Sequence, residues 1–535
     1  MKKFTIAPLL AALATAASMG ANAQIPAPPN GQILSSAYTG KVYSPYAERD
    51  FATGVYFGDT HLHTALSMDA GAFGNRLGLD TAYQFARGEQ VDSTRGGPVR
   101  LSRPLDFLVV ADHSDNMGFF PDLVAGAPFI LEDPTGKDWY ERIKAGQGVG
   151  VAIELIGLFS QDKFPPALTY TPDSAPYKAA WAKTVEAAER YNEPGLFSAL
   201  IGYEWTSMIR GNNMHRVVVY RDGADKGGQM VPFTTVAPAG SIDPRDLWQW
   251  LANYEKTTGG KVLAIAHNGN LSNGLMFPIK EEYDGKELDV DYVNQRARWE
   301  PLYEATQIKG DGETHPFLSP NDEFADYETW DIGNLDVSQA KTDAMLAGEY
   351  AREALKRGLE LEAKLGTNPY KFGMIGSTDS HTSLAAVEEN NFFGKHSGAE
   401  PSPGRMMHPF MKNETGTIMG WQMVASGLAA VWAKENTREA LFDAMERKEV
   451  YATTGTRLAV RFFGGWDFTP TDINNREPAF AGYGRGVPMG GDLPPNKAGA
   501  KAPSFMVYAL RDPIGGNLDR IQIIKGWYDG TQQHE

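Results

Sequence analysis

The chain has 535 residues, of which 42% are hydrophobic and 22% are charged. This composition is typical of a folded globular protein and excludes the disordered, collagen-like and coiled-coil classes. The sequence contains no cysteine, which excludes disulfides, thiolate metal sites and a cysteine nucleophile. Its formal net charge of −16 argues against general nucleic-acid binding, so we expect a small-molecule substrate and no nucleic acid partner.

The first 23 residues have the features of a secretory signal peptide. Lys2 and Lys3 precede an apolar run over 4–17, and Ala21 and Ala23 form a small-x-small cleavage site. We therefore expect cleavage after Ala23 and a periplasmic or secreted protein. No later segment is a continuous apolar run of membrane-spanning length, and no cysteine follows the cleavage site, so the sequence predicts no membrane anchor.

Residues 24–50 contain several prolines and lack periodicity, which predicts an extended lead-in. From residue 51 onward, short apolar runs recur, and most of them end in polar residues. Because these runs do not alternate with polar residues, we expect strands buried on both faces, as in parallel sheets. The expected strands are 55–57, 107–110, 196–202, 217–220, 262–266, 302–308 and 372–375.

Helical patterns lie between the expected strands, at 175–191, 245–257 and 337–365. Alternation of strand and helix predicts an α/β fold, either a barrel or a doubly wound sheet, over 51–455. In a barrel, polar residues at the carboxyl ends of the strands carry the chemistry. Two long insertions, at about 115–195 and 268–334, have the length typical of lids or binding loops.

The pattern changes near the C-terminus. A helix is expected from Asn436 to about 448, and 456–535 is predicted to be a small β-rich unit with strands at 457–463, 504–510 and 520–525. Because a strand-like run comes shortly before Glu535, we expect the natural chain to extend further. The sequence contains no signal for a particular oligomeric state.

Six of the ten histidines lie at the ends of the expected strands. His61 and His63 are two residues apart on an extended segment, so both imidazoles point to one side. Neutral imidazoles with a few carboxylates are the ligands of Zn, Mn and Fe, whereas all-oxygen sites favour Ca and Mg. Burying so many polar groups is costly unless they coordinate cations, so the pattern predicts a metal cluster. Its candidate members are His61, His63, His113, Glu204, His215, His267, Asp379 and His381.

The order of these motifs resembles the polymerase-and-histidinol-phosphatase (PHP) superfamily over about 55–455. The matching motifs are His61-x-His63, His113 within Ala-Asp-His, Glu204 within Gly-Tyr-Glu, His215, His267 within Ala-His-Asn, and Asp379-x-His381. Longer segments at 304–310, 322–328 and 451–455 resemble the exported branch called domain of unknown function 3604, which is similar to carbaryl-hydrolase-like metallohydrolases.

This resemblance implies a distorted (β/α)7 barrel with two or three divalent metal ions, Mn, Zn or Fe, at the carboxyl ends of the strands. His61, His63, Glu204 and Asp379 would hold one metal, and Glu204 would share a second with His215 and His267. His113 and His381 would hold a third. Three-metal relatives have a further ligand eight residues after the first histidine, where this chain has Asp69, a carboxylate that can still coordinate.

The metal cluster predicts a hydrolase. A water that bridges two divalent cations loses a proton near neutral pH and becomes a nucleophile, while the same cations stabilise negative charge on the attacked group. The leading hypothesis is a phosphoesterase acting on a small organic phosphate. The alternatives are a carboxylic ester, lactone or carbamate hydrolase with the same metal centre, and a non-catalytic metal- or ligand-binding periplasmic protein.

Four further residues are candidates for substrate binding or proton transfer. Asp112 is expected either to orient His113 or to relay a proton. Lys309 and Arg405 are candidates to neutralise an anionic substrate, although solvated loop charges are the commoner role of such residues. Arg210 is close in sequence to Glu204 and His215, which predicts a place on the rim of the site.

Overall fold

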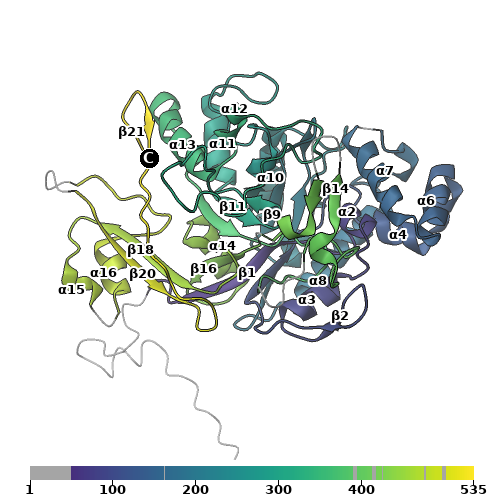
Figure 1. Cartoon of the computed structure of the whole chain (residues 1–535), viewed down its shortest axis with the longest axis horizontal. Coiled ribbons are helices and arrows are strands. Elements are labelled where there is room, and N and C mark those ends of the chain that lie inside the picture. The colour runs from purple at the N-terminus through teal and green to yellow at the C-terminus, as the bar shows by residue number, and fades with distance from the viewer. Residues whose placement is uncertain are drawn as a thin grey trace, which may run out of the picture. The chain divides into compact units, whose positions relative to one another are not determined.

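The computed structural model describes residues 50–161, 163–388, 394–412, 417–424, 426–474, 477–496 and 502–535. The signal peptide expected at 1–23 and the lead-in expected at 24–50 lie outside these residues, apart from Asp50. Residues 51–535 form one compact unit with a mixed α/β fold (Figure 1). No helix among the described residues combines the length and the hydropathy needed to cross a membrane.

Two sheets form the centre of this unit. The first has the strand order β17-β16-β1-β4-β5, and the second has the order β12-β11-β10-β9-β6 with β13 beside β11. The strands of the first sheet are β1 (Gly54–Leu62), β4 (Phe107–Val110), β5 (Ser198–Leu200), β16 (Leu428–Ala433) and β17 (Val450–Thr453). Those of the second are β6 (Gly202–Trp205), β9 (Arg216–Tyr220), β10 (Val262–His267), β11 (Leu302–Gln307), β12 (Gly310–Asp311) and β13 (Gly373–Gly376).

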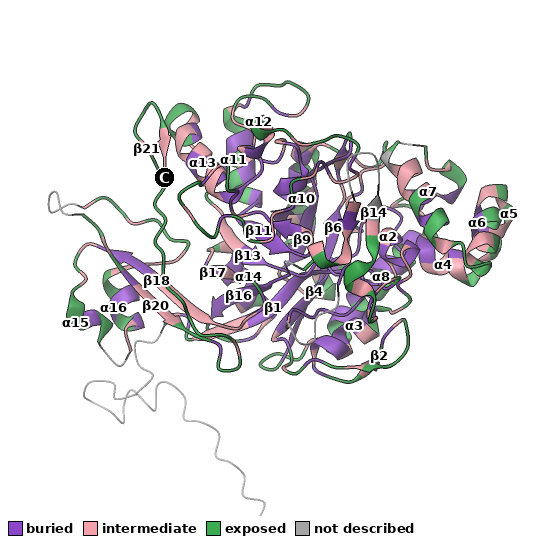
Figure 2. Cartoon of the chain, viewed as in Figure 1, coloured by how far each residue is buried: buried purple, intermediate pink, exposed green. Residues whose placement is uncertain are grey.

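The inner faces of the two sheets share one hydrophobic core. Successive residues of a strand point to opposite faces, and Phe107 and Val109 of β4 pack in the same cluster as Val217 and Val219 of β9. The intervening Leu108 belongs to the outer cluster, together with the helices. Most residues of these strands are buried on both faces, as expected from their unbroken apolar sequence (Figure 2).

The expectation of a parallel barrel is met only in part. β1–β4, β4–β5, β10–β11 and β11–β13 are parallel, whereas β6–β9, β9–β10, β1–β16 and β16–β17 are antiparallel. The link from β6 to β9 spans only 206–215, which is shorter than a parallel crossover requires, so the chain returns antiparallel. Strand pairing among the described residues does not close into a barrel.

Backbone contacts nevertheless join the two sheets. Only Ile201 separates β5 of the first sheet from β6 of the second. On the other side, Gly427 N–H donates to Ser377 O at 3.0 Å, and Asp379 N–H donates to His61 O at 2.7 Å. The first bond joins the start of β16 to the segment that follows β13, and the second joins the end of β1 to the same segment. Both the end of β1 and this segment carry candidate metal ligands.

Helices cover the outer faces of the sheets. In α10, Asp243 caps the first turn by accepting from Arg245 N–H at 2.8 Å, Pro244 occupies the first position, and Gly259 ends the helix at φ 68°. The helices are α2 (Met68–Ala72), α3 (Leu79–Ala86), α4 (Phe119–Ala125), α5 (Pro128–Glu132), α6 (Pro134–Lys144), α7 (Gly148–Ser160), α8 (Ala175–Tyr191), α9 (Ala224–Gly227), α10 (Pro244–Thr258), α11 (Val290–Trp299), α12 (Asp343–Leu346), α13 (Ala351–Leu365), α14 (Arg438–Glu446), α15 (Pro470–Ile473) and α16 (Ala479–Arg485).

One helix prediction is confirmed and another needs correction. α8 matches the helix expected at 175–191, and the segment 115–195 also contains the helices α4 to α7, which the sequence pattern does not predict. The helix expected at 337–365 begins only at Ala351, after the short α12. The reason is tertiary packing: a Cβ on Gly348 would lie 2.2 Å from Gly274 O, and Lys341 pairs with Glu349 at 2.5 Å, so this stretch packs as an irregular segment.

The C-terminal residues form a three-stranded antiparallel sheet of β18 (Ala459–Gly465), β19 (Gly486–Pro488) and β20 (Ser504–Leu510). It contacts the first sheet through Trp432, whose indole donates to Val460 O at 2.8 Å and whose ring lies 3.7 Å from the Arg461 guanidinium. The strand expected at 520–525 is wrong: this segment is irregular, and Ile521 and Ile523 are more than half exposed, so it has no apolar partner that would order it as a strand.

Several small elements complete the fold. The remaining strands form short hairpins: β2 (Val91–Asp92) with β3 (Pro98–Val99), β7 (Met208–Ile209) with β8 (Asn212–Asn213), β14 (Pro409–Lys412) with β15 (Thr417–Met419), and β21 (Trp527–Tyr528) with β22 (Gln533–His534). The short 3-10 helices are η1 (Pro166–Leu168), η2 (Gly269–Leu271), η4 (Arg405–Met407) and η5 (Gly420–Gln422).

Candidate metal centre

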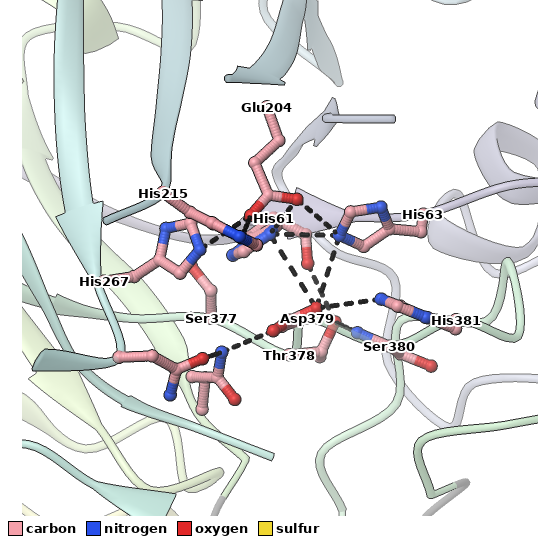
Figure 3. A network of polar contacts seen from close by, with 12 residues as sticks. His61, His63, Glu204, His215, His267, Ser377, Thr378, Asp379, Ser380 and His381 are labelled. Carbon is pink, nitrogen blue, oxygen red and sulfur yellow. Dashed lines mark hydrogen bonds and ion pairs between the residues drawn. The ribbon is translucent and has the colours of Figure 1, made fainter. Parts of the chain in front are cut away.

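The predicted ligands come from the ends of strands in both sheets and meet in one cluster (Figure 3). His61 and His63 lie at the end of β1, His267 is the last residue of β10, and Asp379 follows β13. His215 precedes β9 instead of following it. Because β9 is antiparallel to both β6 and β10, its beginning lies at the same edge of the sheet as their ends.

Glu204 of β6 stands at the middle of the cluster. Its Oε1 lies 2.8 Å from His215 Nδ1 and 2.7 Å from His267 Nε2. Its Oε2 lies 2.8 Å from His113 Nδ1, 3.3 Å from His63 Nε2 and 3.5 Å from His61 Nε2. One buried carboxylate therefore contacts five imidazoles, and its two oxygens face different histidines. This is the arrangement that a carboxylate bridging two cations requires.

Asp379 forms a second centre of contacts. Its Oδ1 lies 3.3 Å from His63 Nε2 and 3.2 Å from His381 Nε2. Gln307 and Lys309 donate to Oδ2, and Lys395 donates to Oδ1 and to the backbone carbonyl of Asp379. The backbone of Asp379 has φ 49°, a left-handed conformation that non-glycine residues seldom adopt outside turns and functional sites.

Asp69 of α2 completes a third group. Its Oδ2 lies 3.2 Å from His113 Nε2 and 3.4 Å from His381 Nδ1, and His63 is the fourth member. Asp69 and His113 are 22% and 11% exposed at their side chains, whereas Glu204 and Asp379 are each 2% exposed. The cluster is thus more open to solvent at this group than at its centre.

Glu304 is a member that sequence reasoning missed. Its two carboxylate oxygens lie 3.3 and 3.1 Å from His61 Nδ1, and β11 places it in register with His267 of β10. Four groups of side chains could each hold a cation. They are His63, Asp69, His113 and His381; His61, His63 and Glu204; His61, His267 and Glu304; and His113, Glu204 and His215.

The donor set fits divalent cations. Within the described residues, His215 Nε2 and His267 Nδ1 are buried with neither a hydrogen bond nor an ion-pair contact, which is uncommon for polar atoms in a native interior. His61 Nε2 and His63 Nε2 lie only 3.0 Å apart, close to the roughly 3.3 Å that separates two nitrogen ligands on a tetrahedral zinc. Imidazole nitrogens that converge on shared carboxylates, some of them without a hydrogen-bond partner, are typical of a metal site.

The electrostatics of the cluster also favour cations. Burial lowers the pKa of His63 to about 3 and that of His215 to about 4, so both imidazoles are unprotonated at neutral pH, the state that coordinates metal. Burial would lower the pKa of His61 too, but Glu304, Asp379 and Glu204 raise it to about 10. Positive charge at this point is therefore strongly stabilised.

Comparison with known proteins assigns a family. The family described as "Protein of unknown function (DUF3604)" matches residues 50–535. The chain belongs to the DUF3604 family. No curated protein matches the sequence. Among solved structures, it is similar to a two-domain protein from Bacteroides vulgatus ATCC 8482 that contains a predicted PHP-like metal-dependent phosphoesterase, with a TM-score of 0.32, 10% identity and 89% of each chain covered.

The other predicted site residues of this DUF3604 chain have mixed outcomes. Lys309 contacts the cluster through Asp379, as described above. Asp112 does not orient the His113 ring: its two oxygens accept from Thr64 N–H at 2.6 Å and from Thr64 Oγ1 at 2.7 Å. The ring of His113 is instead positioned by Glu204, Asp69 and Thr206. Asp112 therefore fixes the loop after His63 rather than an imidazole.

The contacts that the structure shows place neither Arg210 nor Arg405 at the metal centre. The side chain of Arg210 is exposed on the β7–β8 turn at φ 55°, and the Arg405 guanidinium lies 3.5 Å from Glu400. Lys395, by contrast, carried no motif and contacts Asp379 directly. His396 is not among the predicted site residues, yet its ring centroid lies 5.1 Å from that of His381, and its ring stacks on Phe410 with the centroids 4.5 Å apart.

Proposed function

We propose that this chain is a metal-dependent hydrolase of the PHP type that cleaves the ester bond of a small organic phosphate. The observation that carries the proposal is the convergence of six histidines and four carboxylates, from both sheets, on one buried centre. The family-level resemblance of the motif order supports it. We further propose that the two sheets together correspond to a distorted (β/α)7 barrel whose strand pairing is interrupted where the sheets meet. We also propose that the protein is exported and acts in the periplasm or after secretion.

Each residue of the centre has a definite task in this proposal. His61, His63 and Glu204 would hold one cation, with Asp379 close by; Glu204 would share a second with His113, His215 and His267; and Asp69, His113 and His381 would hold a third. Divalent cations of the Mn, Zn or Fe type supply a nucleophile at neutral pH and stabilise charge on the attacked group. The protein positions the substrate and keeps the centre largely closed to bulk water.

The test is a substrate panel on purified protein loaded with Mn, Zn or Fe, with and without a chelator. We expect hydrolysis of an aryl phosphate that the chelator abolishes. Faster hydrolysis of an aryl acetate than of the aryl phosphate would show a carboxylic ester hydrolase instead. Full metal content without hydrolysis of an aryl phosphate, a phosphodiester or an aryl acetate would contradict the assignment and favour a binding protein.

Glu204 gives a direct test of the bridging arrangement. Glu204→Gln replaces the carboxylate by an amide of the same shape, which ligates cations poorly, so we expect loss of turnover and a lower metal content by elemental analysis. Glu446→Gln, on α14 and away from the centre, is the matched control and is expected to keep both. A Glu204→Gln protein with full metal content and full rate would refute the bridging role.

A further inference from the structure

Two lysines lie at the metal centre, and the fold has to bury both to place them there. Lys309 occupies the turn between β11 and β12, and Lys395 is held by the backbone bond from His381 N–H to Lys395 O at 2.9 Å. Their side chains are 13% and 3% exposed, and both ammonium groups contact the same carboxylate, Asp379. Burying an ammonium group costs free energy unless its charge is paired and its N–H donors are hydrogen-bonded.

Asp379 alone does not satisfy the hydrogen-bonding capacity of the two ammonium groups. Each has three N–H donors; Lys395 directs two of them at Asp379 and Lys309 directs one. Within the described residues, the other three have no acceptor in the hydrogen bonds that the structure shows. Gln307 also donates to Asp379, so one carboxylate with a single negative charge faces two ammonium groups and an amide.

The charge balance of the centre points the same way. Four carboxylates, Asp69, Glu204, Glu304 and Asp379, converge on the centre, and the cations bound there would neutralise them. The two lysines pair with one of these carboxylates, Asp379. Once a cation also shares Asp379, the charge of the ammonium groups is left for an anionic ligand, whereas a neutral ester would leave it uncompensated.

We propose that Lys309 and Lys395 form an anion subsite that binds the non-bridging oxygens of a phosphomonoester dianion, so that the enzyme prefers phosphomonoesters to phosphodiesters and to neutral esters. This rests on the proposed hydrolase function and names its substrate class. A phosphate monoester carries close to two charges at neutral pH, and lysine ammonium groups bind phosphate as compact point charges. Lys309 is the more exposed of the two, at 13% against 3% for Lys395.

The experiment compares wild type with Lys309→Met and Lys395→Met after metal loading. Binding of inorganic phosphate is measured by calorimetry, kcat/KM is measured for an aryl phosphate, a bis-aryl phosphate and an aryl acetate, and metal content is measured by elemental analysis. Lys356→Met is the matched control, because Lys356 is also buried, 9% exposed, but pairs with Glu353 and Glu535. Lys395→Arg keeps the charge, and circular dichroism checks folding.

A charge-assisted hydrogen bond predicts a loss of about 10- to 100-fold for each Met variant, both in phosphate affinity and in kcat/KM for the aryl phosphate. The acetate rate should change less than twofold, and Lys395→Arg should recover part of the phosphate affinity. Unchanged phosphate affinity in folded, metal-loaded variants would overturn the subsite. So would equal losses on all three substrates with reduced metal content, because the lysines would then only support Asp379.

The two proposals fail separately. A wild-type protein that binds phosphate in a lysine-dependent way but hydrolyses none of the substrates would support the anion subsite and overturn the hydrolase function. A protein that hydrolyses the aryl acetate fastest, with phosphate affinity unaffected by either lysine, would overturn the subsite and leave a metal-dependent hydrolase.

Discussion

Glu304 lies on the far side of His61 from Glu204, so the imidazole is held between two carboxylates. His61 Nδ1 is 3.1 Å from Glu304 Oε2, and its Nε2 is directed toward Glu204 and Asp379. A carboxylate that accepts from the outer nitrogen of a ligating histidine fixes its tautomer and raises its basicity. Glu304 therefore sets which nitrogen of His61 is available for a cation.

At the residue scale, Glu304→Gln tests this role. The amide oxygen can still accept from Nδ1, but its negative charge is gone, so we expect metal affinity to fall by about 10- to 100-fold. The measurement is the metal dissociation constant, obtained by competition with a chelating dye. Glu362→Gln, on the exposed side of α13, is the control and should leave the constant unchanged. Identical constants for wild type and Glu304→Gln would show that Glu304 only packs beside His61.

At the element scale, a buried ion network joins the second sheet to its covering helices. Glu300, at the end of α11, accepts from Arg216 of β9 at 3.0 Å and from the indole of Trp248 of α10 at 3.0 Å, and Arg296 lies 3.1 Å away. All four side chains are buried. Arg216 directly follows His215, so this network anchors the backbone that presents a candidate ligand.

Glu300→Gln should therefore destabilise the protein strongly, because it leaves two buried guanidinium groups without a counter-charge. We expect a loss of about 3 to 5 kcal/mol in the free energy of unfolding at pH 7, measured by urea denaturation. The control is Arg298→Gln, on the exposed face of the same helix, which should cost less than about 1 kcal/mol. Equal effects of the two substitutions would contradict this account.

The same network predicts a pH dependence. Burial alone would raise the pKa of Glu300, but Arg216 and Arg296 outweigh it and hold the pKa below its ordinary value. The folded state then binds fewer protons than the unfolded state, so the stability that Glu300 contributes is present above pH 4.5 and is lost as the pH falls below it. The stability difference between wild type and Glu300→Gln should shrink over that range.

The strands that could be predicted are those whose sequence is apolar and β-branched, such as Val262–His267. β16, Leu428–Ala433, was not predicted although it pairs with β1, because its alanines have a low strand propensity and its place depends on partners far away in the chain. In the site, the motif histidines lie at or next to the ends of strands and were predictable. Glu304 and Lys395 were not: Glu304 lies within a strand, and a loop brings Lys395 to Asp379.

At the scale of the whole molecule, the candidate ligands cross-link both sheets. His61 and His63 belong to the end of the first sheet, whereas Glu204, His267 and Glu304 belong to the second. A cation bound between them stabilises the folded chain and has no equivalent site in the unfolded one. Metal binding should therefore appear as a gain in global stability.

We expect Mn or Zn at 100 times its dissociation constant to raise the free energy of unfolding by about 2.7 kcal/mol, seen as a higher Tm in calorimetry that a chelator reverses. His267→Ala should abolish most of this gain. His408→Ala, at an exposed histidine outside the cluster, should keep it. A gain that survives in His267→Ala would place the cation elsewhere.

The spacing of the ligands along the chain also has a consequence for biosynthesis. His61 and Asp379 are joined in space but are 318 positions apart in the sequence, and translation at about 5 to 20 residues per second separates their appearance by roughly 16 to 64 s. Three of the four candidate groups are complete once Glu304 has been made, whereas the group of His63, Asp69, His113 and His381 waits for the last of these side chains. Cations can therefore bind this chain in an order, and the position held by Asp69, His113 and His381 is the last to form during synthesis.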